Sequence, residues 1–275
     1  MSFPNIEISK REATLPRWLD DLIFKKMGGQ YCRCNSDMTV IDWGPADILK
    51  YLGTYFPRSF TESYCIFNHL LLNADTYSNM DCIKLLDFGC GTGGEIIGFA
   101  TALSEHRHNI KVLRIKAIDG NQYALKKFEE IKDEFNRRHS LQIICCPSPV
   151  RIDDFYDLSV LDSILDLDYN YDLVLSFKAV CEFVTKKQFR EKNAYEYLTK
   201  FMLPRIADNG NMLMLDVSTK NNVAQEWLPN LMDEGLRDAD VSIIESNSGY
   251  NDLFIVNHSR KTGDISKVVW RLISK

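Results

Sequence analysis

The stretch with the most chemical content is a glycine-rich segment that directly follows an apolar run. It reads Leu-Leu-Asp-Phe-Gly-Cys-Gly-Thr-Gly-Gly over positions 85–94. Glycine permits backbone conformations with positive φ and lets a ligand approach the main chain closely. The helix expected after the loop presents unpaired N–H groups at its N-terminus. The segment therefore predicts a ligand-binding loop between a strand and a helix.

Two classes of ligand use such a loop. Gly89, Gly91 and Gly94 satisfy the G-x-G-x-x-G spacing, in which backbone N–H groups meet a dinucleotide pyrophosphate. Asp87, at the end of the strand, would repel a pyrophosphate but would accept hydrogen bonds from a cationic amino-acid ligand. The next acid at a strand end, Asp119, lies 30 positions beyond Gly89, whereas the dinucleotide pattern places it after ~20. Both observations favour a ligand other than a dinucleotide.

The same segment resembles the first motif of class I S-adenosylmethionine-dependent methyltransferases, a hydrophobic strand that ends in Asp-x-Gly-x-Gly-x-Gly. Residues 117–121 are similar to the second motif, whose acid binds both ribose hydroxyls, and residues 171–176 are similar to the fourth-strand motif. The resemblance covers residues 83–275 and implies a Rossmann-like fold, S-adenosylmethionine as the cofactor and methyl transfer as the activity. It implies a first set of cofactor-binding residues: Asp87, Gly89, Cys90, Gly91, Asp119, Gly120, Asn121 and Phe177.

Three acids that follow predicted strands, Asp119, Asp153 and Asp154, each have two interpretations. Asp119 offers two acceptor oxygens to two hydroxyls, or it caps the helix expected over 123–138. Asp153 and Asp154 follow the third strand, where the family often places an acid against the adenine amino group. Other acids crowd the same loop, so a solvated acidic loop explains the pair almost as well. Phe155 either covers the adenine or packs in the core.

A second segment is expected to close over the cofactor. Residues 55–64 weakly resemble the lead-in of ribosomal small-subunit methyltransferase-like proteins. By that resemblance Arg58 pairs with the cofactor carboxylate and Tyr64 lines the pocket, so that residues 55–72 form a lid. In the alternative interpretation the segment packs on the outside of the sheet.

The elements that must position these residues follow an alternating pattern from Ile83 onward, which predicts an α/β fold with a mostly parallel sheet. Strands are expected at 83–88, 112–118, 141–146, 171–177 and 211–217, and helices at 95–103, 123–138 and 186–206. Strand-like segments at 241–245, 253–257 and 266–273 predict a C-terminal antiparallel hairpin. Residues 1–82 form an N-terminal helical extension, with helices at 18–27, 46–56 and 60–72. Pro57 is expected to separate the last two.

Composition limits the remaining choices. The chain is 45% hydrophobic and 26% charged, with a formal net charge of −5, which is ordinary for a globular protein. The first 25 residues contain no secretory signal pattern, and no apolar run reaches the ~18 residues of a membrane span. We expect a cytoplasmic protein whose eight cysteines are reduced thiols, with no metal site.

The methyl acceptor is the part of the predicted function that the sequence determines least. Residues 176–183 lack the motifs used for attack on nucleic-acid bases, so no catalytic residue is assigned, and Lys178 and Glu182 are expected to form an ion pair one helical turn apart. RNA is slightly favoured over a small molecule or a protein because seven basic residues lie between 178 and 205, on and around a helix expected to begin at a Thr185 capping box. A solvated helix face explains them equally well. The basic residues are Lys178, Lys186, Lys187, Arg190, Lys192, Lys200 and Arg205.

Two other functions are alternatives to methyl transfer. One is a non-catalytic assembly or regulatory protein, and the other is an NAD(P)-dependent oxidoreductase.

Overall fold

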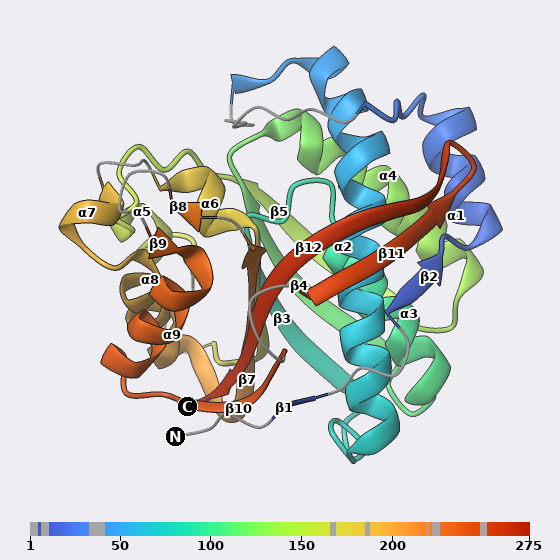
Figure 1. The fold of residues 1–275 in the computed structure, drawn as a ribbon. Helices are drawn as coiled ribbons and strands as arrows, with labels where there is room; N and C mark the ends of the chain where they lie inside the picture. Colours follow the sequence, from blue (N-terminus) through green and yellow to red (C-terminus); the bar gives the residue numbers. More distant parts are fainter. Residues whose placement is uncertain are drawn as a thin grey trace.

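A computed structural model describes residues 5–6, 11–32, 42–165, 169–184, 188–218, 220–221, 226–247 and 252–275. A ten-stranded mixed sheet runs through the middle of the molecule and separates two layers of helices (Figure 1). Helices α1–α4 cover one face, and α5–α9 cover the other. The predicted α/β class is confirmed.

Five parallel strands form the centre of the sheet, in the order β7-β6-β3-β4-β5. Their bounds are β3 Cys82–Phe88, β4 Val112–Asp119, β5 Gln142–Pro149, β6 Tyr171–Phe177 and β7 Ile206–Val217. The chain moves outward from β3 to β5 and then returns to β6 on the other side of β3. Ligands of such sheets bind at this switch point, beyond the carboxyl ends of the strands. The glycine-rich loop follows β3 and lies at that point.

The C-terminal part of the sheet is antiparallel, as predicted. Strand β12 (Lys261–Ser274) runs antiparallel to β7, and it also pairs with β10 (Ser242–Asn247) and β11 (Asp252–His258). Two short N-terminal strands add to the sheet: β1 (Asn5–Ile6) pairs with β10, and β2 (Glu12–Thr14) pairs with β11. The N-terminal extension is therefore tied into the sheet of the main domain. A separate two-stranded ribbon joins β8 (Lys220–Asn221) to β9 (Glu226–Trp227).

The two helices expected around Pro57 are one continuous helix, α2, Pro45–Asn73, so the predicted break is wrong. Proline inside a helix costs about 3 kcal/mol through the missing N–H and a backbone clash. Packing offsets this cost, because α2 buries Phe56, Phe60 and Phe67 against the rest of the core. Before it, the segment expected as a helix over 18–27 forms α1 (Arg17–Asp21) and a π-helical turn, η1 (Leu22–Lys26).

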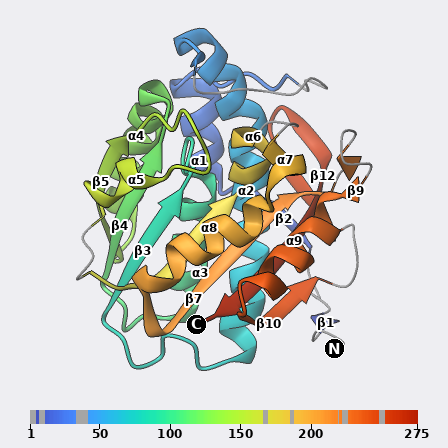
Figure 2. The same cartoon turned by 90° about the vertical axis from the view of Figure 1, so that its left-hand side faces the viewer.

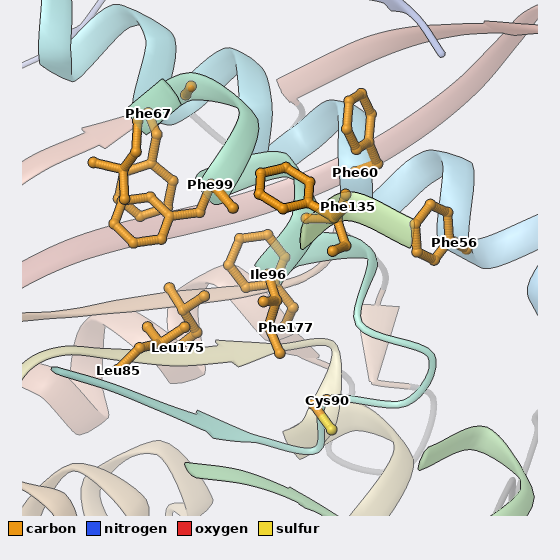
Figure 3. Close-up of a cluster of buried hydrophobic side chains, with 14 of the residues drawn as sticks. Phe56, Phe60, Phe67, Leu85, Cys90, Ile96, Phe99, Phe135, Leu175 and Phe177 are labelled. Atoms are coloured by element: carbon orange, nitrogen blue, oxygen red, sulfur yellow. The ribbon is translucent and has the colours of Figure 1, made fainter. Parts of the chain in front are cut away.

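Small residues let α2 approach α3 (Gly94–His106) closely. Gly94 and Gly98 of α3 face Ser59 and Ser63 of α2, and the Ser63 hydroxyl donates to the Glu95 carbonyl at 2.7 Å. Figure 3 shows Phe67 of α2 beside Phe99 of α3, in a buried cluster that also contains Leu85 of β3 and Leu175 of β6. The crossing places the middle of α2 beside the glycine-rich loop, since α3 begins where the loop ends.

This crossing predicts that Gly98→Ala lowers the free energy of unfolding by about 1–3 kcal/mol. A Cβ on Gly98 would lie 2.5 Å from the Phe60 carbonyl oxygen and 3.0 Å from Ser63 Cβ, so both helices must shift. Urea denaturation measures the loss. The control is Gly44→Ala at the start of α2, where a Cβ meets nothing within 4 Å and the loss should stay below about 1 kcal/mol. Equal losses in the two variants would contradict the close crossing.

The opposite face of the sheet carries shorter helices than the sequence predicts. Instead of one helix over 186–206, the structure has α7 (Gln188–Glu191), α8 (Ala194–Met202) and a 3-10 turn, η3 (Leu203–Arg205). The Asn193 side chain caps α8, and Thr185 lies outside the described residues. Figure 2 shows α8 and α9 across this face. The remaining helices are α4 (Gln122–Arg138), α5 (Ser159–Asp162), α6 (Ala179–Phe183) and α9 (Leu228–Asp238).

Candidate cofactor-binding site

The glycine-rich loop needs its glycines. Gly89, Gly91 and Gly93 have φ of +80°, +50° and +77°, a region that other L-residues rarely adopt. The N–H groups of Gly89 and Cys90 both donate to the Ile118 carbonyl, at 2.9 and 3.0 Å, which anchors the loop to the end of β4. A Cβ on Gly91 would lie 2.7 Å from the Tyr51 hydroxyl oxygen. The loop thus presents bare main chain to its surroundings.

Asp119, at the end of β4, is bonded to this loop. Its Oδ2 accepts the Gly91 N–H at 2.8 Å, and its Oδ1 accepts the Asn121 N–H at 2.7 Å. Removal from water raises the pKa of Asp119 to about 6, and the two backbone hydrogen bonds oppose the rise. A carboxylate oxygen has room for a second hydrogen bond. Both oxygens can therefore still accept from a ligand.

The helix-cap interpretation of Asp119 is wrong, because Asn121 caps α4. The Asn121 Oδ1 accepts the N–H groups of Tyr123 and Ala124 at 2.9 and 3.1 Å, and its Nδ2 donates to the Trp43 carbonyl. The side chain of Asn121, a predicted cofactor residue, is thus engaged by the protein itself. Gly120, between Asp119 and Asn121, is half-buried.

Asp87 and Glu95 form a buried carboxyl pair beneath the loop. Asp87, the residue before the last of β3, has no exposed surface, and neither carboxyl oxygen receives an N–H or O–H group from the described residues. Glu95, in the first turn of α3, lies within hydrogen-bonding reach of Asp87. Burial raises the pKa of both carboxyls well above the ordinary value. Sequence reasoning missed Glu95; an acid in the first turn of a helix is a common feature and gave no separate signal.

Lys178 occupies the turn after β6, with φ of +58°. Its Nζ lies 2.6 and 2.7 Å from the two carboxylate oxygens of Glu62 on α2. The Ser266 hydroxyl of β12 donates to the same carboxylate. The predicted pair of Lys178 with Glu182 is therefore wrong: a residue 116 positions away takes its place. The Lys178–Glu62 pair joins the helical layer to the carboxyl edge of the sheet.

Glu182 and Tyr51 bring further polar groups to this edge. Removal from water raises the pKa of Glu182 to about 8, and the neighbouring acids Asp119 and Asp216 add to the rise. Removal from water also raises the pKa of the Tyr51 hydroxyl, with Glu182 and Glu95 adding to it. Within the described ranges no hydrogen bond reaches either group. The site is therefore rich in carboxyl groups, and its neighbouring cation, Lys178, is already paired.

Arg58 and Tyr64 are both engaged by partners within the protein, and their assignment to the cofactor stays a prediction. The Arg58 guanidinium binds Asp264 of β12 through Nε at 2.7 Å and Nη2 at 3.0 Å. The Tyr64 hydroxyl donates to Glu105 at 2.8 Å, and its ring lines a cavity shared with Thr101 near the other end of α3. The hydrogen-bonding groups of both side chains therefore already have partners in the protein.

Asp153 and Asp154 lie exposed in the loop after β5. Asp153 pairs with Arg151 at 2.8 Å, and Asp154 accepts the Tyr156 N–H at 3.0 Å. These contacts agree with the interpretation as a solvated acidic loop, and the adenine contact stays a prediction. Phe155 is buried in the core. Asp166 and Asp168, which belong to the same acidic segment, lie outside the described residues.

Cys90 and Phe177, the last predicted cofactor residues, pack beneath the loop. Both are almost fully buried in the cluster of Figure 3. Burial raises the pKa of the Cys90 thiol well above its ordinary value. Their side chains therefore support the floor of the site, while their backbones border it.

The basic stretch 178–205 does not form one exposed face in the described part. Lys178 and Arg205 are buried, the latter beside Asp162. Lys192 lies 4.1 Å from the centre of the Tyr197 ring, and Lys200 pairs with Glu196. Lys186 and Lys187 lie outside the described residues, as does the side chain of Arg190.

The described ranges bear on membrane insertion and on metal binding. No helix there is long and apolar enough to cross a membrane. No group of three or more His, Cys, Asp or Glu side chains there is arranged to hold a metal ion.

Comparison with known proteins reveals the fold. No family model matches the chain, and no curated protein matches it in sequence. Among solved structures, the trans-methyltransferase CalH in complex with SAH matches with a TM-score of 0.50 and 11% identity, over 84% of this chain and 62% of that one. The chain has the fold of class I S-adenosylmethionine-dependent methyltransferases. This confirms the fold that the sequence motifs imply.

Two further structures of the same kind match. The mitomycin 7-O-methyltransferase MmcR gives a TM-score of 0.49 and 11% identity, over 86% of this chain and 59% of that one. The magnesium protoporphyrin IX methyltransferase of Synechocystis PCC 6803 with bound SAM gives 0.48 and 10%, over 92% and 90%. The chain thus spans about 60% of CalH and MmcR and most of the Synechocystis protein.

Proposed function

We propose that the protein binds S-adenosylmethionine at the glycine-rich loop and transfers its methyl group to an acceptor at the carboxyl edge of the sheet. The observation that carries this proposal is Asp119: its Oδ2 accepts the Gly91 N–H of the loop, its Oδ1 accepts the Asn121 N–H, and each oxygen can accept one more hydrogen bond. The bare backbone of Gly91 lies beside it. The donor set suits a ligand with paired hydroxyls. When bound, the cofactor supplies an electrophilic methyl group on a cationic sulfur.

Different residues of the chain would bind the cofactor, cover it and accept a proton. Asp119 would hold the ribose hydroxyls, and the first turns of α2, with Tyr51 against Gly91, would cover the loop and exclude water. The lid predicted over 55–72 stays a prediction; Tyr51, which contacts the loop at Gly91, lies outside those bounds. Glu182 is suited to accept a proton from an acceptor, because its pKa of about 8 lies near the working pH of a general base.

The acceptor stays a prediction, and the charge of the site bears on it. Asp119 and Asp216 lie near Glu182 at this edge of the sheet, and carboxylates repel RNA phosphates. This favours a small neutral or cationic acceptor over RNA, which the basic stretch had suggested. Mass spectrometry of molecules that co-purify with the protein distinguishes the two, because bound RNA fragments would contradict the small acceptor.

Cofactor choice is the direct test of the proposed function. Calorimetric titration should show that S-adenosylmethionine or S-adenosylhomocysteine binds at least tenfold more tightly than NAD⁺, a difference of about 1.4 kcal/mol or more. The physical reason is the carboxyl-rich edge, which repels a pyrophosphate. Binding of NAD⁺ alone would show that the loop serves a dinucleotide and that the oxidoreductase alternative is correct.

A further inference from the structure

We propose that Asp87 and Glu95 hold one proton between them and that this pair releases the proton when a cationic cofactor binds. Glu95 is then a positioning residue of the cofactor site, acting through Asp87. This inference rests on the proposed function, since it takes S-adenosylmethionine as the ligand of the loop. It names a coupling between ligand charge and protein charge that the motif by itself does not contain.

The burial of the two carboxyls favours a shared proton. Asp87 has no exposed surface and Glu95 is 3% exposed, so water does not hydrate the charges. No N–H or O–H group of the described residues reaches either Asp87 oxygen, yet the Glu95 carboxyl is within hydrogen-bonding reach. Two neighbouring carboxyl groups that water does not hydrate disfavour simultaneous ionisation, and one proton between them makes the contact a hydrogen bond.

Among the described residues, no unpaired cation faces the pair. Lys178 approaches from the end of β6, but its charge is balanced by Glu62 of α2 at 2.6 Å. The other titratable groups that face the pair carry negative charge or none. They come from α2, the loop, β4, β5 and α6, and they are Tyr51, Cys90, Asp119, Cys145 and Glu182. Retaining a proton is therefore the favourable state of the free pair.

A ligand cation at the loop changes this balance. A positive charge near Asp87 favours the ionised form of the pair. The O–H bond of the shared carboxyl then breaks, and the proton passes to the buffer; no other bond forms or breaks. Because binding releases a proton, affinity for the cation rises with pH, by at most tenfold per unit, and becomes constant once the free pair is already ionised.

Calorimetry of the full chain tests the coupling. Titration with S-adenosylmethionine in two buffers of different ionisation enthalpy should show release of close to one proton. The neutral thioether 5′-methylthioadenosine, which lacks the amino-acid group, should bind without proton release. Glu95→Gln should abolish the release and flatten the pH dependence, since an amide donates to Asp87 without a titrating proton. The matched control is Glu105→Gln at the other end of α3, which should keep the release.

The outcomes separate this inference from the proposed function. Tight binding of S-adenosylmethionine to the wild type with no proton exchange, or equal release with both ligands, overturns the inference and leaves the function standing. Failure of the cofactor to bind overturns the function instead. Infrared spectroscopy of the ligand-free protein then decides the shared proton: a protonated-carboxyl band at neutral pH that Glu95→Gln removes supports it, and absence of the band refutes it. If Glu95→Gln does not fold, the two-ligand comparison on the wild type remains decisive.

Discussion

Replacing Lys178 by methionine should lower the free energy of unfolding by about 3–5 kcal/mol, the cost of leaving one member of a buried ion pair without its partner. Lys178 is 8% exposed and Glu62 is fully buried, with Nζ 2.6 Å from the carboxylate. Without the ammonium group, the Ser266 hydroxyl is the neutral donor left to Glu62. Urea denaturation followed by circular dichroism measures the change.

Two comparisons separate loss of the pair from loss of packing. Lys200→Met removes an exposed lysine that lies 2.6 Å from Glu196, and it should change stability by less than about 0.5 kcal/mol. Adding Glu62→Gln to Lys178→Met removes the uncompensated charge, so the double variant should regain much of the loss. If Lys178→Met behaves like Lys200→Met, the pair does not hold α2 to the sheet.

Asp119→Ala should weaken binding of S-adenosylmethionine more than tenfold. Each charged hydrogen bond removed costs about 1.5–3 kcal/mol before water replaces it, and the variant also frees the Gly91 and Asn121 N–H groups that shape the loop. Calorimetric titration measures the affinity. Binding as tight as that of the wild type would mean that the ligand does not use Asp119.

The neighbouring cap supplies the matched control for this variant. Asn121→Ala removes the oxygen that caps α4 and should cost about 1 kcal/mol of stability. Its cofactor affinity should change little, because the Asn121 side chain bonds to the protein itself. The two substitutions should thus act on different quantities, affinity at Asp119 and stability at Asn121.

Local patterns in the sequence determined the elements of the central sheet. Strand β6 has the predicted bounds, 171–177, and β3 and β4 differ from prediction by one residue at one end. Their apolar runs are long enough for strands buried on both faces. The amphipathic helix α4 also lies within one residue of its expected start. The glycine positions with positive φ follow from the lack of a side chain, which is again a local property.

Tertiary packing decided the continuity of α2 and the partners of its side chains, because the free energy of burial exceeds local conformational preferences. Pro57 argues for a helix break, but burial of the middle of α2 on all sides, Pro57 included, keeps the helix continuous. The predicted partner of Lys178 was the acid one turn away, whereas a buried ammonium needs a buried carboxylate, and Glu62 of α2 supplies it. Arg58 suited a ligand carboxylate by its chemistry, and the fold brings Asp264 to it instead.

The candidate site divides in the same way. The loop, Asp87 and Asp119 are placed by the strands that carry them, so spacing along the chain was enough to propose them. Glu95, Glu62, Tyr51 and Glu182 join them only because α2, α3 and α6 meet at one edge of the sheet. Which carboxyl keeps a proton there depends on distances and burial between elements far apart in sequence, and those are properties of the folded chain.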